Sequence, residues 1–144
     1  MTPACVLCQG DGGRLVWRND RCRVILADEP DYPGFVRVIW QAHMAEFSDL
    51  TAQDRQDLMA LVSRVEQVVR AVMQPTKINL AALGNMVPHL HWHVIPRYAD
   101  DAHFPGAIWA APQRAVAADA LAHRQALASG LPLALQQALS AELH

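Results

Sequence analysis

The sequence predicts an α+β domain built on a largely antiparallel sheet. Short segments rich in Val, Ile and aromatic residues alternate with turn-forming residues, and one long stretch has the 3.6-residue periodicity of a helix. Strands joined by short turns pair antiparallel, because a parallel pair needs a long crossover. A chain of 144 residues can bury its own core without disulfides. We therefore predict a single domain over residues 1–144.

Five segments have the length and composition of strands. Asn19-Asp20 is a turn that joins the first two segments into a hairpin, and Gly84-Asn85 is a turn before the last. A stretch rich in Pro and Gly separates the second segment from the third, which is rich in β-branched and aromatic residues. The predicted strands cover residues 14–17, 22–27, 35–40, 77–83 and 89–96.

The long periodic stretch predicts a helix over residues 52–73. Thr51 is a suitable N-cap, with Asp54 three residues further on, and apolar residues then recur at helical spacing. Pro75 cannot continue a helix and ends it.

The C-terminal segment differs in composition from the rest of the chain. Residues 113–144 are rich in Ala and Leu, and residues 129–132 read Ser-Gly-Leu-Pro, which predicts a break. We expect two helices of low sequence complexity, appended to a core of about residues 5–110.

Charge and composition exclude some functions. The 12 Lys and Arg residues against 14 Asp and Glu leave a net charge of −2, so there is no basic surface for nonspecific nucleic-acid binding. No segment approaches the ~20 apolar residues of a membrane span. The first residues lack the features of a signal peptide. We expect a cytoplasmic protein, in which Cys5-x-x-Cys8 indicates a metal or redox motif rather than a disulfide.

The most informative segment is the heptapeptide His89-Leu90-His91-Trp92-His93-Val94-Ile95. Successive side chains of a strand point to opposite faces, so all three imidazoles are expected on one face and the apolar residues on the other. Histidine titrates near neutrality and can act as a nucleophile, base or metal ligand. Buried polar groups need partners, so three histidines in a row favour chemistry over packing.

Two kinds of chemistry fit this segment. The Cα atoms of His89 and His93 are expected ~13 Å apart, too far for one metal ion to bind all three histidines, although a His-x-His pair can share an ion with other ligands. Alternatively, His91 is a nucleophile that attacks phosphorus. It then needs one ring nitrogen free and the other donating to a fixed acceptor such as a backbone carbonyl. His93 would lie beside the leaving group, and His89 would orient the cluster.

The segment HLHWHVIPR resembles the His-φ-His-φ-His-φ-φ motif, with φ apolar, of the histidine triad (HIT) family of nucleotide hydrolases and transferases. The similarity includes Asn79, Gly84 and residues 43–50, so roughly residues 5–97 follow the family's order. The chain is similar to bacterial members described as diadenosine-tetraphosphate-hydrolase-like. The resemblance implies a five-stranded antiparallel sheet with two helices, a homodimer, and cleavage of a purine nucleotide at its α-phosphate.

The resemblance also implies roles for single residues. His91 would be the nucleophile, His93 the contact to the scissile bridging atom, and Asn79 a polar contact in the nucleotide site. Many relatives have Gln and then Ser or Thr where this chain has Asn85 and Met86. A shorter amide and a thioether thus replace groups that contact phosphate in those relatives. Asn85 is still expected to contact the substrate, but the substrate preference stays open.

Cys5, Cys8, His43 and His89 together meet the ligand count of a closed structural zinc site. Some HIT relatives resemble this arrangement, with the first histidine of the triad as a ligand. We hypothesise that zinc pins the N-terminal segment to the sheet and fixes His89, which in turn steadies His91. The alternative is that both cysteines are idle thiols and that His43 forms a hydrogen bond with His89.

Three charged residues after the triad carry weaker signals. Arg97 can contact a phosphate, yet an Arg at the end of a strand is more often solvated or paired at the surface. Asp100 and Asp101 are adjacent acids in a turn, which are usually solvated.

The sequence favours a hydrolase that cleaves a dinucleoside polyphosphate or a nucleoside phosphoramidate through a covalent nucleotidyl intermediate at His91, without a redox cofactor. Three alternatives remain. They are nucleotidyl transfer to an acceptor other than water, a nucleotide-binding regulatory module with negligible turnover, and a His-x-His metal enzyme.

Overall fold

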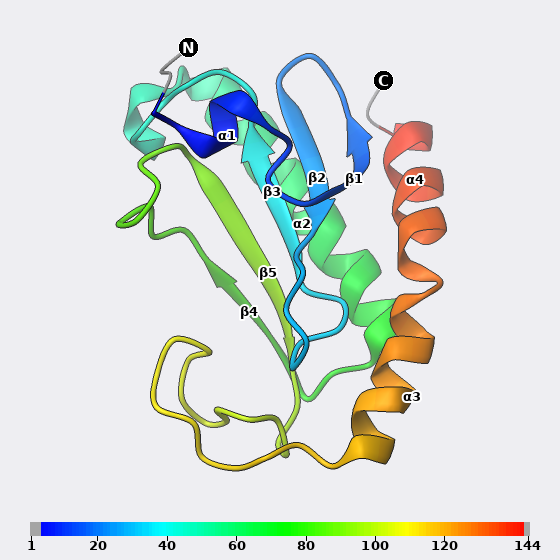
Figure 1. Ribbon diagram of the computed structural model, residues 1–144. Coiled ribbons are helices and arrows are strands. Elements are labelled where there is room, and N and C mark those ends of the chain that lie inside the picture. Colours follow the sequence, from blue (N-terminus) through cyan, green and yellow to red (C-terminus); the bar gives the residue numbers. More distant parts are fainter. Residues whose placement is uncertain (1–3, 143–144) are drawn as a thin grey trace.

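A five-stranded antiparallel sheet forms the centre of the molecule, which confirms the predicted fold class. The computed structural model describes residues 4–142 (Figure 1). The strand order is β1-β2-β3-β5-β4, and every neighbouring pair is antiparallel. The strands are β1 (Arg14–Arg18), β2 (Cys22–Leu26), β3 (Val36–Trp40), β4 (Lys77–Ala81) and β5 (His91–Arg97).

The turns are those that the sequence predicts. The side-chain Oδ1 of Asn19 accepts hydrogen bonds from the backbone N–H groups of Arg21 and Cys22, at 3.0 and 2.8 Å, and so fixes the β1–β2 hairpin. Gly84 has a φ of 74°, in the left-handed region that favours glycine.

The histidine strand begins two residues later than predicted. The backbone N–H of His89 donates to Val87, and that of Leu90 donates to Met44. These bonds hold His89 in a bend before β5, while the carbonyl of Leu90 accepts from the backbone N–H of Trp40 at the end of β3. Only His91 and His93 therefore share a strand face, and the expectation of three histidines on one strand is corrected.

The long helix α2 (Ala52–Met73) has the predicted bounds. The Thr51 hydroxyl accepts a hydrogen bond from the Asp54 backbone N–H at 3.1 Å, as expected of an N-cap. Gln74 ends the helix in a left-handed conformation with φ of 49°. The apolar side of α2 packs on one face of the sheet, against residues of β2, β3 and β5.

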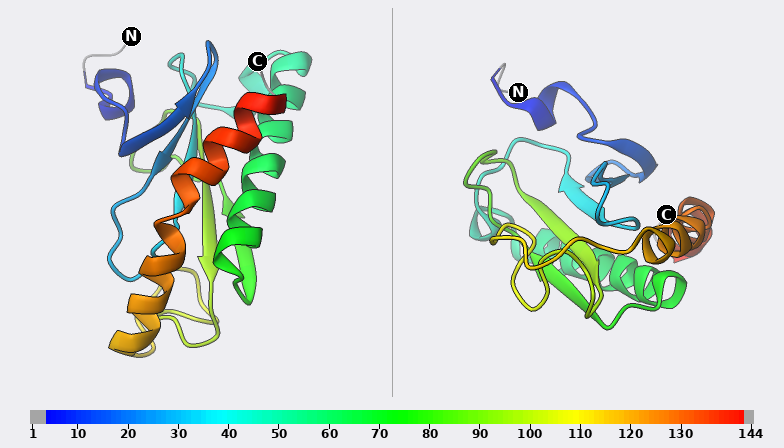
Figure 2. Two further views of the ribbon diagram at one scale, coloured as in Figure 1. Left: turned by 90° about the vertical axis from the view of Figure 1, so that its right-hand side faces the viewer. Right: turned by 60° about the horizontal axis from the view of Figure 1, so that its bottom comes forward.

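The C-terminal segment forms α3 (Ala118–Ala128) and α4 (Leu131–Glu142), with the predicted break between them. Leu131, Leu135 and Leu139 recur every four residues, so they lie on one side of α4, and all three are fully buried in the main core. Figure 2 shows α4 beside α2 on the same face of the sheet. Within the Ala- and Leu-rich tail, α4 is therefore part of the core. Among the described residues, no helix is long and apolar enough to cross a membrane.

The opposite face of the sheet carries polar side chains. Arg37 of β3 stands opposite His93 of β5, and Ile39 stands opposite His91. The short helix α1 (Val6–Gln9) lies on this side of the sheet, while α2 lies on the other (Figure 1). The two faces thus have separate roles: one is the apolar core, and the other holds the candidate site.

Candidate functional site

His91 is held in one tautomer by the backbone. Its Nδ1 lies 2.6 Å from the carbonyl oxygen of His89. A carbonyl can only accept, so Nδ1 carries a proton, and in the neutral ring Nε2 has the free lone pair. This is the arrangement that a nucleophilic imidazole needs. The carbonyl that accepts this bond belongs to His89, which lies in the bend before β5.

His93 is held in the opposite tautomer. Its Nδ1 lies 3.2 Å from Nε of Arg37, a group that can only donate, so the proton of a neutral His93 is on Nε2. Burial, followed by the nearby His91 and Arg37, lowers the pKa of His93 to about 4. The rings of Phe35, Trp109 and His91 pack edge-on against it, with centroids 5.0–5.6 Å away. His93 is thus a neutral hydrogen-bond donor at pH 7.

A cavity of about 600 Å³ opens beside the two histidines. This volume is in the range that binds small molecules. Its walls come from α1, β3, β5, the loop between β4 and β5, and Trp109, and they are mostly apolar. The lining residues are Val6, Leu7, Gly12, Arg37, Leu83, Gly84, Asn85, Met86, Val87, His91, His93 and Trp109.

The two asparagines expected at the substrate lie in different places. Asn85 lines the cavity. Asn79 is not among the lining residues, and its Oδ1 accepts a hydrogen bond from Nη1 of Arg97 at 2.7 Å. The geometry therefore brings Asn85 to the histidines and ties Asn79 to the far end of β5.

Arg97 and Asp101 are not solvated, which corrects the expectation for both. Arg97 is 2% exposed and Asp101 is fully buried. Two parallel hydrogen bonds of 2.8 and 3.0 Å join them. Burial raises the pKa of Asp101, but Arg97 and three backbone N–H groups outweigh it and hold the pKa at about 2. Asp100 is exposed, as expected, and pairs with Arg124.

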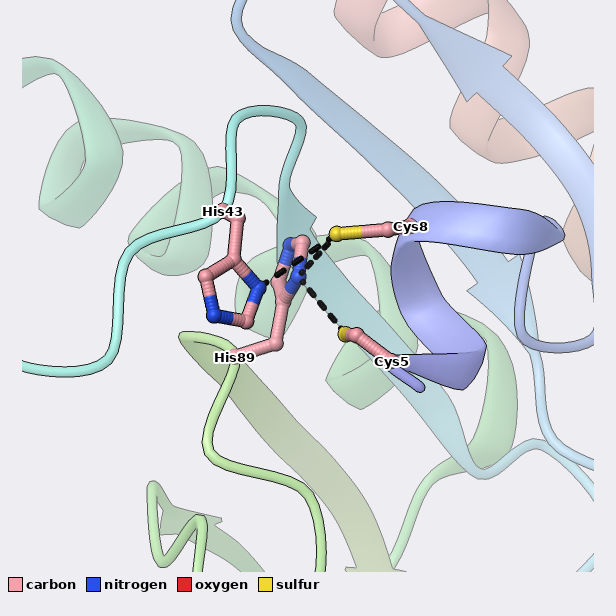
Figure 3. Close-up of side chains that lie close together, drawn as sticks. All are labelled: Cys5, Cys8, His43 and His89. Carbon is pink, nitrogen blue, oxygen red and sulfur yellow. Dashed lines mark hydrogen bonds between the residues drawn. The ribbon is translucent and has the colours of Figure 1, made fainter. Parts of the chain in front are cut away.

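Cys5, Cys8, His43 and His89 come together, as the sequence led us to expect. Their ligand atoms all lie within 4.8 Å of one another (Figure 3). The distance from Sγ of Cys8 to Nδ1 is 3.3 Å for His43 and 3.5 Å for His89, and Sγ of Cys5 lies 3.4 Å from Nδ1 of His89. A tetrahedral zinc site with ordinary Zn–S and Zn–N bonds needs S···N distances of about 3.5 Å. The four residues fit a zinc ion.

The second ring nitrogen of His89 supports the same conclusion. Nε2 of this fully buried residue lies 2.6 Å from the carbonyl oxygen of Trp40, so Nε2 carries the proton and Nδ1 faces the sulfurs with a lone pair. Metal-binding histidines usually donate their other N–H in this way. The structure has no hydrogen bond between His43 and His89, which was the alternative to a metal site. The rings of His43 and His89 stand edge to face, and both Nδ1 atoms face sulfur.

The fold, the arrangement of the histidines and the cavity together define a histidine triad protein. Comparison with known protein families and solved structures agrees. The HIT domain family matches residues 12–100, more than half of the chain, and the protein belongs to this family. A histidine triad protein of Bradyrhizobium japonicum has the same fold, with a TM-score of 0.70, 25% identity, and coverage of 88% of this chain and 90% of that one.

Two curated relatives have named activities. AP-4-A phosphorylase of Mycobacterium tuberculosis is 32% identical over 98 residues, which cover 64% of this chain and 50% of the relative. The asymmetrical bis(5'-nucleosyl)-tetraphosphatase of Schizosaccharomyces pombe is 32% identical over 95 residues, which cover 62% and 52%. The chain thus spans about half the length of the curated relatives it matches.

Arg37 is a site residue that sequence reasoning missed. Arg37 is the one charged residue in the apolar segment 35–40. Its position between two core residues of the strand could have indicated that it lies on the face opposite the core. Trp109 is an aromatic residue that the sequence allows at either the nucleotide site or the core, and the structure places its ring against His93 from a loop outside any periodic segment.

Proposed function

We propose that the protein cleaves a dinucleoside polyphosphate at the α-phosphate, with His91 as the nucleophile. The observation that carries the proposal is the hydrogen bond from Nδ1 of His91 to the His89 carbonyl, which leaves Nε2 as the nucleophilic nitrogen of the neutral ring. The cavity beside it has the size of a nucleotide site, and both curated relatives are named for activities on such compounds.

The reaction has two displacements at phosphorus. In the first, the Nε2 lone pair of His91 attacks the α-phosphorus. The P–O bond to the rest of the substrate breaks, and the leaving polyphosphate takes the electron pair. In the second, an acceptor attacks the same phosphorus, the P–N bond breaks, and the electron pair returns to Nε2. The proton of a water acceptor goes to solvent. His93 donates a hydrogen bond from Nε2–H to the leaving oxygen, and Asn85 contacts the substrate.

The identity of the acceptor decides between two reactions. One curated relative is named a phosphorylase and the other a tetraphosphatase. Water yields AMP and ATP from diadenosine tetraphosphate, and inorganic phosphate yields ADP and ATP. We propose hydrolysis, and the products formed with and without phosphate distinguish it from phosphorolysis. A module that binds nucleotide without turnover would form neither set of products.

We also propose that Cys5, Cys8, His43 and His89 hold a structural zinc ion. When bound, it supplies a cross-link between α1 and the start of β5. The backbone carbonyl of His89 holds the ring of His91, so fixing His89 positions the nucleophile. No step of the reaction requires the metal, and no redox cofactor is involved.

The remaining proposals concern the whole molecule. We propose one folding unit over residues 1–144, supported by the burial of the α4 leucines in the main core. By likeness to the family, we propose a homodimer in the cytoplasm that takes a purine nucleotide and binds neither nucleic acid nor membrane. Analytical ultracentrifugation tests the assembly.

The nucleophile is tested by His91→Ala on diadenosine tetraphosphate. We expect kcat to fall by about 10³-fold or more, with the fold retained. Acid-quenched wild type should carry one nucleotidyl group by mass spectrometry, and the variant none. His123→Ala, at an exposed position of α3, is the matched control and should leave activity unchanged. A variant at position 91 that keeps more than a tenth of the activity would refute the assignment.

A further inference from the structure

Arg37 is the only Lys or Arg among the residues that line the cavity. Its Nε donates to His93, and its guanidinium lies over the ring of Phe35, 4.8 Å from the centroid. Within residues 4–142, no carboxylate lies within ion-pair distance of Arg37, and its two η nitrogens make no hydrogen bond. Arg37 is half-buried, and Glu29 acts on its charge only from beyond ion-pair distance, so the guanidinium is open to an anionic ligand in the cavity.

The contact between Arg37 and His93 has a chemical consequence. A guanidinium has donors and no acceptor, so Nδ1 of His93 must keep its lone pair toward Arg37. Protonating Nδ1 would place an N–H against an N–H and a cation against a cation. His93 therefore stays neutral, with its only proton on Nε2. The charged and titratable groups that face it are Arg37 on β3 and His91 on its own strand.

Leaving groups differ in what they need from such a residue. When a phosphoanhydride breaks, the leaving phosphate takes the electron pair and departs as a stable anion, so a hydrogen bond from Nε2–H and a nearby positive charge are sufficient. When a phosphoramidate breaks, the departing nitrogen must gain a proton, because an amide anion is too basic to leave. Only an imidazolium could supply that proton from position 93.

We propose that Arg37 is a positioning residue that holds His93 as a neutral Nε2–H donor, so that the site selects phosphoanhydride substrates over phosphoramidates. The proposal rests on the proposed function and deepens it, because it chooses between two substrate classes that the histidine motif alone leaves open. The free η nitrogens of Arg37 add to the selection, since they lie where a charged leaving phosphate can contact them.

The tautomer can be measured without any turnover. In protein with 15N-labelled histidine, the imidazole correlations of His93, assigned by their loss in His93→Gln, should show a protonated Nε2 and an unprotonated Nδ1. In Arg37→Met, we expect protonation of Nδ1 to become detectable and His93 to titrate at higher pH. Arg14→Met, an exposed arginine on β1, is the matched control and should leave the spectrum unchanged. Identical His93 signals in wild type and Arg37→Met would overturn the proposal.

Leaving-group selection is measured as the ratio of kcat/KM for diadenosine tetraphosphate to that for adenosine 5'-phosphoramidate. Removing one preorganised hydrogen-bond donor from an oxyanion site typically costs about 10²–10³-fold in kcat, so we expect Arg37→Met to lower the ratio by about 100-fold, mainly through kcat on the tetraphosphate. Arg37→Lys should recover part of the loss, because it restores charge without the Nε–H contact. A ratio unchanged within about threefold in Arg37→Met would refute the selection.

The two proposals fail in different ways. His91→Ala should abolish turnover of both substrates. If wild type turns over neither, the proposed function is wrong, and the histidine spectra still decide the role of Arg37. If wild type prefers the phosphoramidate, the function class stands and the inference about Arg37 is refuted.

Discussion

The two ends of β5 are both held by polar clusters, but these clusters are satisfied in different ways. At the C-terminal end, Arg97 and Asp101 form a complete ion pair, supported by Asn79 and backbone groups. At the N-terminal end, the cysteine and histidine cluster brings together two thiols and two imidazoles, all of which can donate an electron pair to a metal ion. The first cluster needs nothing further, whereas the second is completed by a metal or by protons. The difference separates a purely structural anchor from one that can respond to its surroundings.

The largest expected effect is at the C-terminal anchor. Asp101→Asn leaves Arg97 buried without a counter-charge, and such a loss typically costs about 3–5 kcal/mol of unfolding free energy. Urea denaturation of the variant measures it. Asp31→Asn, at an exposed acid, should change stability little. A loss below about 1 kcal/mol would show that Arg97 finds other partners or water.

As the pH falls, the contribution of His93 to the free energy of unfolding should be lost before that of Asp101. The folded pKa of His93, about 4, lies below the unfolded value near 6.5, so its contribution is present above pH 6.5 and is lost as the pH falls to 4. The full difference corresponds to about 3 kcal/mol. Asp101, with a folded pKa of about 2, contributes above pH 4 and loses that contribution only between pH 4 and 2.

The pH dependence can be assigned to His93 by mutation. His93→Gln should flatten the stability profile between pH 6.5 and 4, measured by denaturation at each pH, and should leave the loss below pH 4 in place. An unchanged slope between pH 6.5 and 4 in this variant would assign the effect to another group.

Metal removal tests the N-terminal anchor. Protein purified without a histidine tag should contain one zinc per chain. A hundredfold excess of free zinc over Kd should stabilise the fold by about 2.7 kcal/mol relative to the chelated protein. Cys8→Ser should lose the metal and this stabilisation. Cys22→Ser is the control, because Cys22 lies in the core away from the cluster, so the variant should keep its zinc. Substoichiometric zinc after growth in zinc-replete medium would refute the site.

The smallest expected effects separate the two asparagines. Asn79→Ala removes an acceptor from the Arg97 guanidinium and should cost about 1–3 kcal/mol of stability, with little change in KM. Asn85→Ala should leave stability unchanged and raise KM, because Asn85 is an exposed residue of the cavity wall. Thermal melts and steady-state kinetics of both variants measure the difference. A raised KM in Asn79→Ala would return that residue to the substrate site.

Much of this protein follows from local patterns. The periodicity of residues 52–73, the Thr51 cap and the Asn19 turn determine their elements within a few residues of chain, and the structure confirms each of them. The alternating histidines identified the family and the side of the sheet that carries the site. The spacing of Cys5 and Cys8, with His43 and His89, was enough to predict a cluster, because few residue sets have this composition.

Only the tertiary structure decided the rest, because the decisive contacts join residues far apart in the chain. Strand register places Arg37 against His93, 56 positions later, and no local pattern encodes which residues of two strands face each other. The bend before β5 moves His89 off the strand, and folding of the loop after it buries Asp101 on Arg97. The sequence alone thus identified the family, and packing decided which ring nitrogens of His89, His91 and His93 face hydrogen-bond acceptors and which do not.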